Sequence, residues 1–213
     1  MSAWLDRFYR SLPEPLTPRV RWLLVLVLVP LALGATQRLW TIRFLAPQYP
    51  KGLELQVYAY TIAGGNGGQD LSEINTLNHY VGMRKLDPAD FADLDFIPFA
   101  IGALVLLTLR VAAIGDVRSL LDLAVLTGYF GLFSLGRFVY TLYGYGHHLD
   151  PTAPIRMEGF MPPVLGTRQI ANFAVSSFPG LGTLLISVFG VTVVGVALYE
   201  GVVRRERARA SVP

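Results

Sequence analysis

The sequence predicts an all-α integral membrane protein, a four-helix transmembrane bundle with a small mixed extracytoplasmic cap formed by two long loops. Three observations predict this fold. Of the 213 residues, 53% are hydrophobic and only 15% are charged, whereas a soluble domain carries roughly 25% charged residues. Four apolar segments approach the roughly 20 residues that a helix needs to cross a bilayer. The basic residues gather on one side of these segments.

The four predicted spans are apolar around the whole helix, as expected of helices in contact with lipid. Pro30 lies in the middle of the first span and predicts a kink there, because proline cannot donate a backbone hydrogen bond. Trp22 and Trp40 lie 18 residues apart, a separation that suits the two membrane interfaces. The chain is predicted as a single membrane domain of residues 1–213, with spans at about 20–40, 96–114, 121–143 and 181–202.

Orientation follows from charge, because lysine and arginine mark cytoplasmic loops. The segment 41–95 carries seven acidic and four basic residues. We therefore expect both termini in the cytoplasm and the segments 41–95 and 144–180 outside, which in a bacterium is the periplasmic side of the inner membrane. The basic residues form no face interleaved with aromatics, which argues against nucleic acid as a partner. The arginines assigned to the cytoplasmic side are Arg7, Arg10, Arg19, Arg21, Arg110, Arg118, Arg204, Arg205, Arg207 and Arg209.

The outer segments show weaker but readable patterns. Alternating apolar residues over 53–59 predict a strand, and the glycines of 64–68 predict a turn. A helix is predicted from Asp70 to about Met83, with Asp70 and Glu73 at the spacing of a capping box. Five prolines between residues 151 and 179 exclude a long helix in the second outer segment.

Histidine and methionine concentrate in these outer segments. All three histidines and every methionine except Met1 fall there, although methionine in membrane proteins usually fills the apolar spans. The chain has no cysteine, and imidazole with thioether suits copper(I) in an oxidising compartment. Copper is therefore the candidate cofactor. The candidate ligands are His79, Met83, His147, Met157 and Met161.

Two interpretations without metal stay open. In the first, the cap is a docking surface whose polar side chains bond to one another, and the chain is an interaction or anchor subunit of a respiratory complex. In the second, lipid or quinone binds between helices near Gly128, Gly131 and Gly136. No nucleophile elbow and no chain of midplane charges is present, so neither an enzyme nor a transporter is expected. The candidate partner or structural residues are Asn75, Asn78, Tyr80, Asp150 and Arg137.

Three longer strings carry a resemblance to a known family. They are APQYPKGL at 46–53, EINTLNHYVGM at 73–83 and YGHHLDPTA at 145–153. Over about residues 40–180 the chain resembles the NosB-like family of small four-span bacterial membrane proteins, which accompany nitrous oxide reductase of the atypical (clade II) clusters and its copper-maturation genes. The resemblance implies a non-catalytic auxiliary role in denitrification, in which the protein assembles, anchors or supplies with copper a periplasmic respiratory enzyme of the nitrous oxide reductase type.

The resemblance also bears on single residues. The family commonly has asparagine at the position of His148, which favours His147 as the ligand of the pair. The stretch around Arg137 tends to be acidic in the family, so this arginine departs from the pattern.

Overall fold

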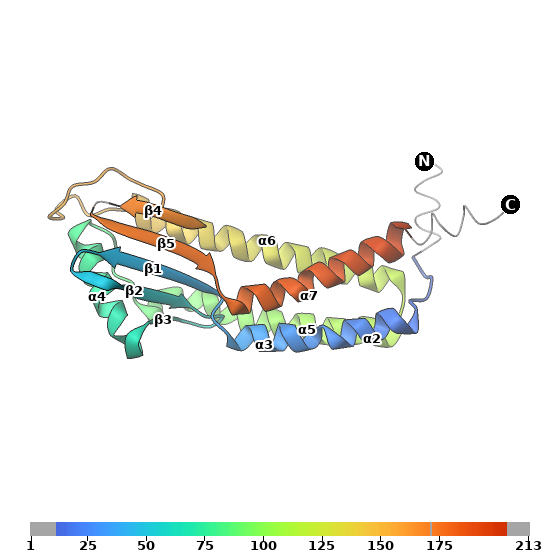
Figure 1. Cartoon of the computed structure of the whole chain (residues 1–213). Coiled ribbons are helices and arrows are strands. Elements are labelled where there is room, and N and C mark those ends of the chain that lie inside the picture. The colour runs from blue at the N-terminus through green and yellow to red at the C-terminus, as the bar shows by residue number, and fades with distance from the viewer. Residues whose placement is uncertain (1–11, 171, 204–213) are drawn as a thin grey trace, which may run out of the picture. The chain divides into compact units, whose positions relative to one another are not determined.

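A computed structural model describes residues 12–170 and 172–203 of the chain (Figure 1). The basic residues expected at the two ends, at positions 7, 10, 204, 205, 207 and 209, lie outside these described residues. The chain divides into two compact units. Among the described residues, the helical unit comprises 12–33, 100–132 and 185–203, and the sheet unit comprises 34–99, 133–170 and 172–184.

The sheet unit contains a five-stranded antiparallel sheet, so the predicted all-α fold is wrong and the protein is of mixed α/β class. The strands are β1 (Trp40–Ala46), β2 (Tyr49–Val57), β3 (Ile62–Gly64), β4 (Gly166–Ile170) and β5 (Phe173–Pro179), and they are arranged in the order β3-β2-β1-β5-β4. Buried side chains alternate with exposed ones along β1 and with mostly half-buried ones along β5, the period of a sheet with one face covered. Of the five strands, only β2 is predicted by the sequence analysis.

The helices are α2 (Pro18–Leu26), α3 (Leu28–Thr36), α4 (Gln69–Tyr80), α5 (Phe96–Ile114), α6 (Val117–His147) and α7 (Leu181–Leu198). Short 3₁₀ turns occupy Asn66–Gly68 and Pro88–Asp95, and a π turn occupies Tyr199–Val203. Within the described ranges, four helical segments are long and apolar enough to cross a membrane: Pro18–Thr36, Pro88–Ile114, Val117–His147 and Leu181–Gly201. These segments indicate a membrane protein whose apolar helices suit contact with lipid.

The first of these segments is broken as Pro30 predicts. Helix α2 ends at Leu26 and α3 begins at Leu28, because Pro30 has no N–H to donate to the carbonyl one turn earlier. Its start is also explained by local chemistry, since the Thr17 hydroxyl accepts from the N–H of Val20 and proline occupies the first helical position. The segment ends at Thr36, so the predicted extension to residue 40 is not helical.

The helical unit is held by apolar packing and by one arginine. Leu24, Leu120 and Phe189 are fully buried in it, and helices in lipid associate through close packing of this kind. Arg21 donates from Nε to the carbonyl of Ala112 at 2.6 Å. Through this bond α2 supplies a partner for a carbonyl group that the end of α5 would leave unpaired.

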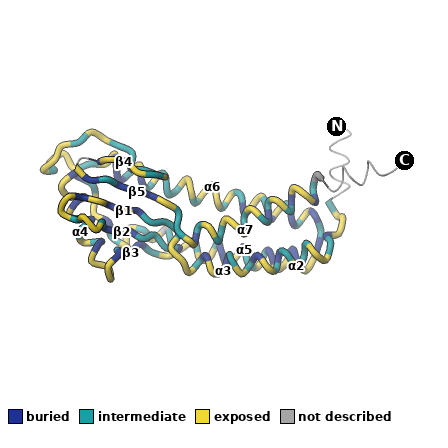
Figure 2. Tube along the Cα trace, in the orientation of Figure 1, coloured by how far each residue is buried: buried dark blue, intermediate teal, exposed yellow. Residues whose placement is uncertain are grey.

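The core of the sheet unit lies on one face of the sheet, where α4 and the end of α6 cover it (Figure 2). Strand residues Phe44 and Leu55 pack there with Ile74 of α4 and Tyr145 of α6. Helix α4 is therefore amphipathic, and its apolar side packs against the covered face of the sheet. This packing places the C-terminal ends of α4 and α6 beside the loop of residues 148–165.

Candidate functional site

The three strings singled out in the sequence contact one another in the sheet unit. The hydroxyl of Tyr49, in the first string, donates to the carboxylate of Glu73 in the second. The N–H of Asp150, in the third string, donates to the carbonyl of Gly82 in the second at 2.8 Å. Segments separated by up to about a hundred residues thus form one surface.

Two glycines let the loop 148–165 approach the helix ends closely. Gly82 has φ +77°, and a side chain there would place its Cβ 2.8 Å from the carbonyl oxygen of Asp150. A Cβ at Gly146 would collide with the carbonyl oxygen of Phe160, whose N–H donates to Gly146 at 2.9 Å. The N–H of Ile155 donates to the carbonyl of Tyr80 at 2.9 Å. The loop is therefore fixed by backbone hydrogen bonds at both ends.

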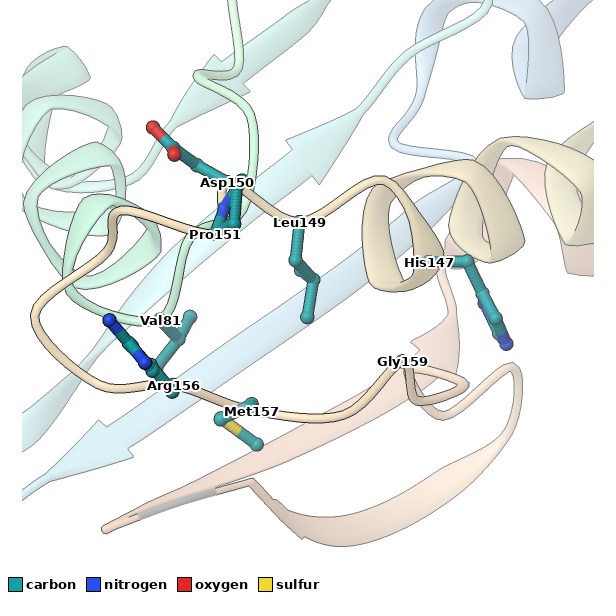
Figure 3. A pocket seen from close by; sticks show the side chains of 8 residues that line it. All are labelled: Val81, His147, Leu149, Asp150, Pro151, Arg156, Met157 and Gly159. Carbon is teal, nitrogen blue, oxygen red and sulfur yellow. The ribbon is translucent and has the colours of Figure 1, made fainter.

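A pocket of about 510 Å³ lies beneath this loop (Figure 3). It brings together His147, Met157 and Asp150 of the predicted site residues. In Figure 3 the imidazole of His147 lies at one end of the pocket, the thioether of Met157 lies between Arg156 and Gly159, and the carboxylate of Asp150 points away from both. The residues that line the pocket are Val81, His147, Leu149, Asp150, Pro151, Arg156, Met157 and Gly159.

The His147 ring is held in one orientation. Its Nδ1 lies 3.0 Å from the carbonyl oxygen of Tyr143, and because a carbonyl only accepts, Nδ1 is the protonated nitrogen. The ring stacks on that of Tyr143 with centroids 3.8 Å apart. A Cβ at Gly159 would lie 3.1 Å from its Cδ2. The lone pair of His147 is therefore on Nε2, the arrangement that metal-binding histidines use when their other nitrogen is hydrogen-bonded.

The other candidate ligands lie outside the pocket. His79 is exposed near the end of α4, with its ring centroid 6.3 Å from that of Tyr80. Met83 and Met161, like Met157, pack against the core of the sheet unit. The methionines thus have a packing role that the sequence pattern does not reveal.

Asp150 is bound to its own loop. One of its oxygens accepts from the N–H of Thr152 at 2.8 Å and from the Thr152 hydroxyl at 2.6 Å. These hydrogen bonds lower the pKa of Asp150, and the charge of His79 lowers it further. Asp150 therefore stays ionised at neutral pH and stabilises the turn that opens the loop.

The remaining predicted residues, Asn75, Asn78, Tyr80 and Arg137, do not line the pocket. Asn75 accepts from the N–H of Leu86 at 2.7 Å and donates to its carbonyl at 3.0 Å. Asn78 is 1% exposed, and its Oδ1 has no hydrogen-bond partner among the described residues. Arg137 lies over the ring of Tyr140, 5.7 Å from its centroid.

The predicted capping box does not form. Gly68 occupies the N-cap position of α4 and provides no side-chain hydrogen bond. The carboxylate of Asp70 instead accepts from the backbone N–H of Glu54 on β2, and Glu73 accepts from Tyr49. Both acidic side chains therefore bond to residues of strand β2 and not to the start of α4. Arg156 lines the pocket, and no pattern in the sequence predicted this position for it.

Among the residues that the structure describes, no three or more His, Cys, Asp or Glu side chains are arranged to hold a metal ion. No family model, curated protein or solved structure matches the chain. The fold and the site define a helical membrane protein with an antiparallel sheet and a pocket beneath a fixed loop.

Proposed function

We propose that the chain is a non-enzymatic auxiliary protein of the bacterial inner membrane that anchors or assembles a periplasmic copper-dependent respiratory enzyme of the nitrous oxide reductase type. The observation that carries this proposal is the contact between the three strings on which the family resemblance depends. They form one fixed surface through the Tyr49–Glu73 and Asp150–Gly82 hydrogen bonds.

This surface has the properties of a docking site. Tyr80 is 49% exposed at the end of α4 while its carbonyl holds Ile155 of the loop. His79, Asp150 and Arg156 are also exposed. An exposed aromatic ring on a rigid support, surrounded by charged groups, is the composition of an interface centre with a polar rim.

Co-purification tests the docking role. A tagged full-length chain is isolated in detergent from membranes of a host that expresses a nitrous oxide reductase, and the retained reductase is measured by immunoblot with and without a chelator. Tyr80→Ala should reduce retention by roughly tenfold or more, as expected when an aromatic anchor of an interface is removed. Tyr60→Ala is the matched control, because Tyr60 is 54% exposed and lies outside the three strings. Equal retention by both variants would remove the docking role.

A second candidate function, copper(I) handling, rests on the orientation of His147. Its Nε2 lone pair is available in a pocket that Met157 also lines, and copper(I) accepts imidazole with thioether. His147 would supply the imidazole ligand and Met157 the thioether ligand.

Copper(I) titration against a colorimetric chelator tests this second function. The His147→Ala, Met157→Leu double variant should lose the ion that the wild type binds. His148→Ala should keep it, since the ring of His148 also bonds to a helix carbonyl but does not line the pocket. Identical stoichiometry in the wild type and the double variant would exclude copper handling at this pocket.

A further inference from the structure

A second hollow lies in the helical unit, in a groove between α2 and α5 with a volume of about 410 Å³. We propose that this groove binds one anionic phospholipid, with an acyl chain along its apolar wall and the phosphate at Arg21. The residues that carry the argument are Arg21, Trp22 and Val25 of α2 and Leu109, Ala112 and Ala113 of α5.

The wall of the groove suits an acyl chain. Trp22 is 74% exposed and Leu109 is 43% exposed, although both are large apolar side chains. The two alanines at 112 and 113 leave room between the helices. Exposed tryptophan near the end of a membrane helix is typical of the lipid interface, where its ring meets chains and headgroups together.

Arg21 is held rigidly at the rim. Its Nε donates to the carbonyl of Ala112 at 2.6 Å and its Nη2 donates to the carbonyl of Ala113 at 2.7 Å. Gly115, with φ +75°, lets the guanidinium lie against the turn after α5, where a Cβ would be 3.1 Å from Arg21 Cζ. Nη1 makes no hydrogen bond with the described residues. A fixed guanidinium with free donors binds phosphate without losing much further conformational entropy.

The charges around the groove favour an anion. Among the residues that the structure describes, Arg21 is the one ionisable side chain that lines the groove, and no acid of this part of the chain lines it. Pro18, the first residue of α2, also lines the groove, which places the positive end of the helix dipole at the same rim. Arg19 and Arg110 are exposed next to lining residues in the sequence. A zwitterionic lipid or a neutral quinone would leave this positive potential unmatched.

Native mass spectrometry of the detergent-solubilised full chain tests the proposal. The chain is titrated separately with phosphatidylglycerol, phosphatidylcholine and ubiquinone. We expect one tightly retained phosphatidylglycerol per chain, with about a fivefold preference over phosphatidylcholine, the gain typical of one arginine near an anionic lipid. Equal retention of the two lipids, or displacement of phosphatidylglycerol by the quinone, would overturn the proposal.

A pair of variants locates the site. Ala113→Phe fills the groove and should abolish the retained phosphatidylglycerol. Ala103→Phe adds the same ring at another exposed position on α5, ten residues earlier, and should leave retention unchanged. Arg21→Gln should keep lipid binding but lose the fivefold preference. Retention by Ala113→Phe equal to that by Ala103→Phe would place the lipid elsewhere and refute the assignment, whether or not Arg21→Gln folds.

Discussion

The indole N–H of Trp40 donates to the hydroxyl of Ser177 at 2.7 Å, although the two residues lie 137 positions apart in the chain. Ser177 is fully buried and in turn donates to the carbonyl of Val164 at 3.0 Å. The Trp40–Ser177 hydrogen bond links β1 to β5. The Ser177–Val164 hydrogen bond links β5 to the segment that precedes β4. One buried hydroxyl thus joins three segments of the sheet unit.

Ser177→Ala should destabilise the protein by about 1–3 kcal/mol, because the indole N–H and the Val164 carbonyl both lose a buried partner. Ser176→Ala is the matched control. Ser176 bonds only at the surface, to the hydroxyl of Thr167, and its loss should cost no more than about 0.5 kcal/mol. Thermal unfolding in detergent measures both variants. Equal midpoints for the two would show that the Trp40–Ser177 link contributes no stability.

Gly146→Ala should displace the loop 148–165, because the new Cβ would collide with the carbonyl of Phe160. Relief of such a clash typically costs about 1–3 kcal/mol. Trypsin cleavage after the exposed Arg156 should become faster. Gly144→Ala provides the control on the same helix, since its Cβ would meet only a His148 ring atom at 3.9 Å. Cleavage as slow as in the control would mean that the loop is not held by this contact.

Much of the membrane part could be predicted from the sequence, because a long apolar run is a local property. The break before Pro30 and the strand β2 were likewise visible in local patterns. Strand β1 was missed because its first residue, Trp40, was assigned to the end of the first predicted span. Strand β1 pairs with β5, where Trp40 lies opposite Pro179. The local composition of neither strand indicates a partner so far away in the sequence.

In the candidate site, too, contacts between residues close in sequence could be predicted, and contacts between distant segments could not. That His147 and Met157 share a pocket follows from their closeness in the sequence. The contact of Asp150 with Gly82 depends instead on how α4 packs against the sheet. The sequence predicts a helix from Asp70 to about Met83, but α4 ends at Tyr80, so Met83 lies beyond the helix and packs on the core.

Asn75→Asp should weaken the attachment of α4 to the segment after it. The substitution removes the donor that bonds to the carbonyl of Leu86 and sets a carboxylate against that carbonyl. We expect a loss of about 1–3 kcal/mol in unfolding free energy, the cost of an unpaired polar group. Thr76→Ala, at an exposed neighbouring position, should change it little. The idea fails if chemical denaturation gives the two variants the same stability.

The hydrogen bond between Tyr49 and Glu73 predicts a dependence on alkaline pH. The bond to the Glu73 carboxylate, together with desolvation and the charge of Glu73, raises the pKa of Tyr49 above its ordinary value of 10.0. Because the pKa of Tyr49 is higher in the folded than in the unfolded protein, the hydrogen bond contributes its full stability at pH values below the unfolded pKa. This contribution is lost as the pH rises through the folded pKa. The stability difference between wild type and Tyr49→Phe should therefore be constant from pH 7 to about 9 and should shrink above about pH 10. Tyr60→Phe serves as the control, and a difference that does not change with pH would contradict the prediction.

We propose that the four apolar helices cross a membrane, with the three strings on the periplasmic side. The chain has no cysteine, so single cysteines report position without background. Lys51→Cys, Glu158→Cys and Arg118→Cys replace exposed residues, and a membrane-impermeant maleimide is added to intact spheroplasts. We expect labelling at positions 51 and 158 and none at 118 until the membrane is broken. Labelling at 118 alone in intact spheroplasts would contradict it.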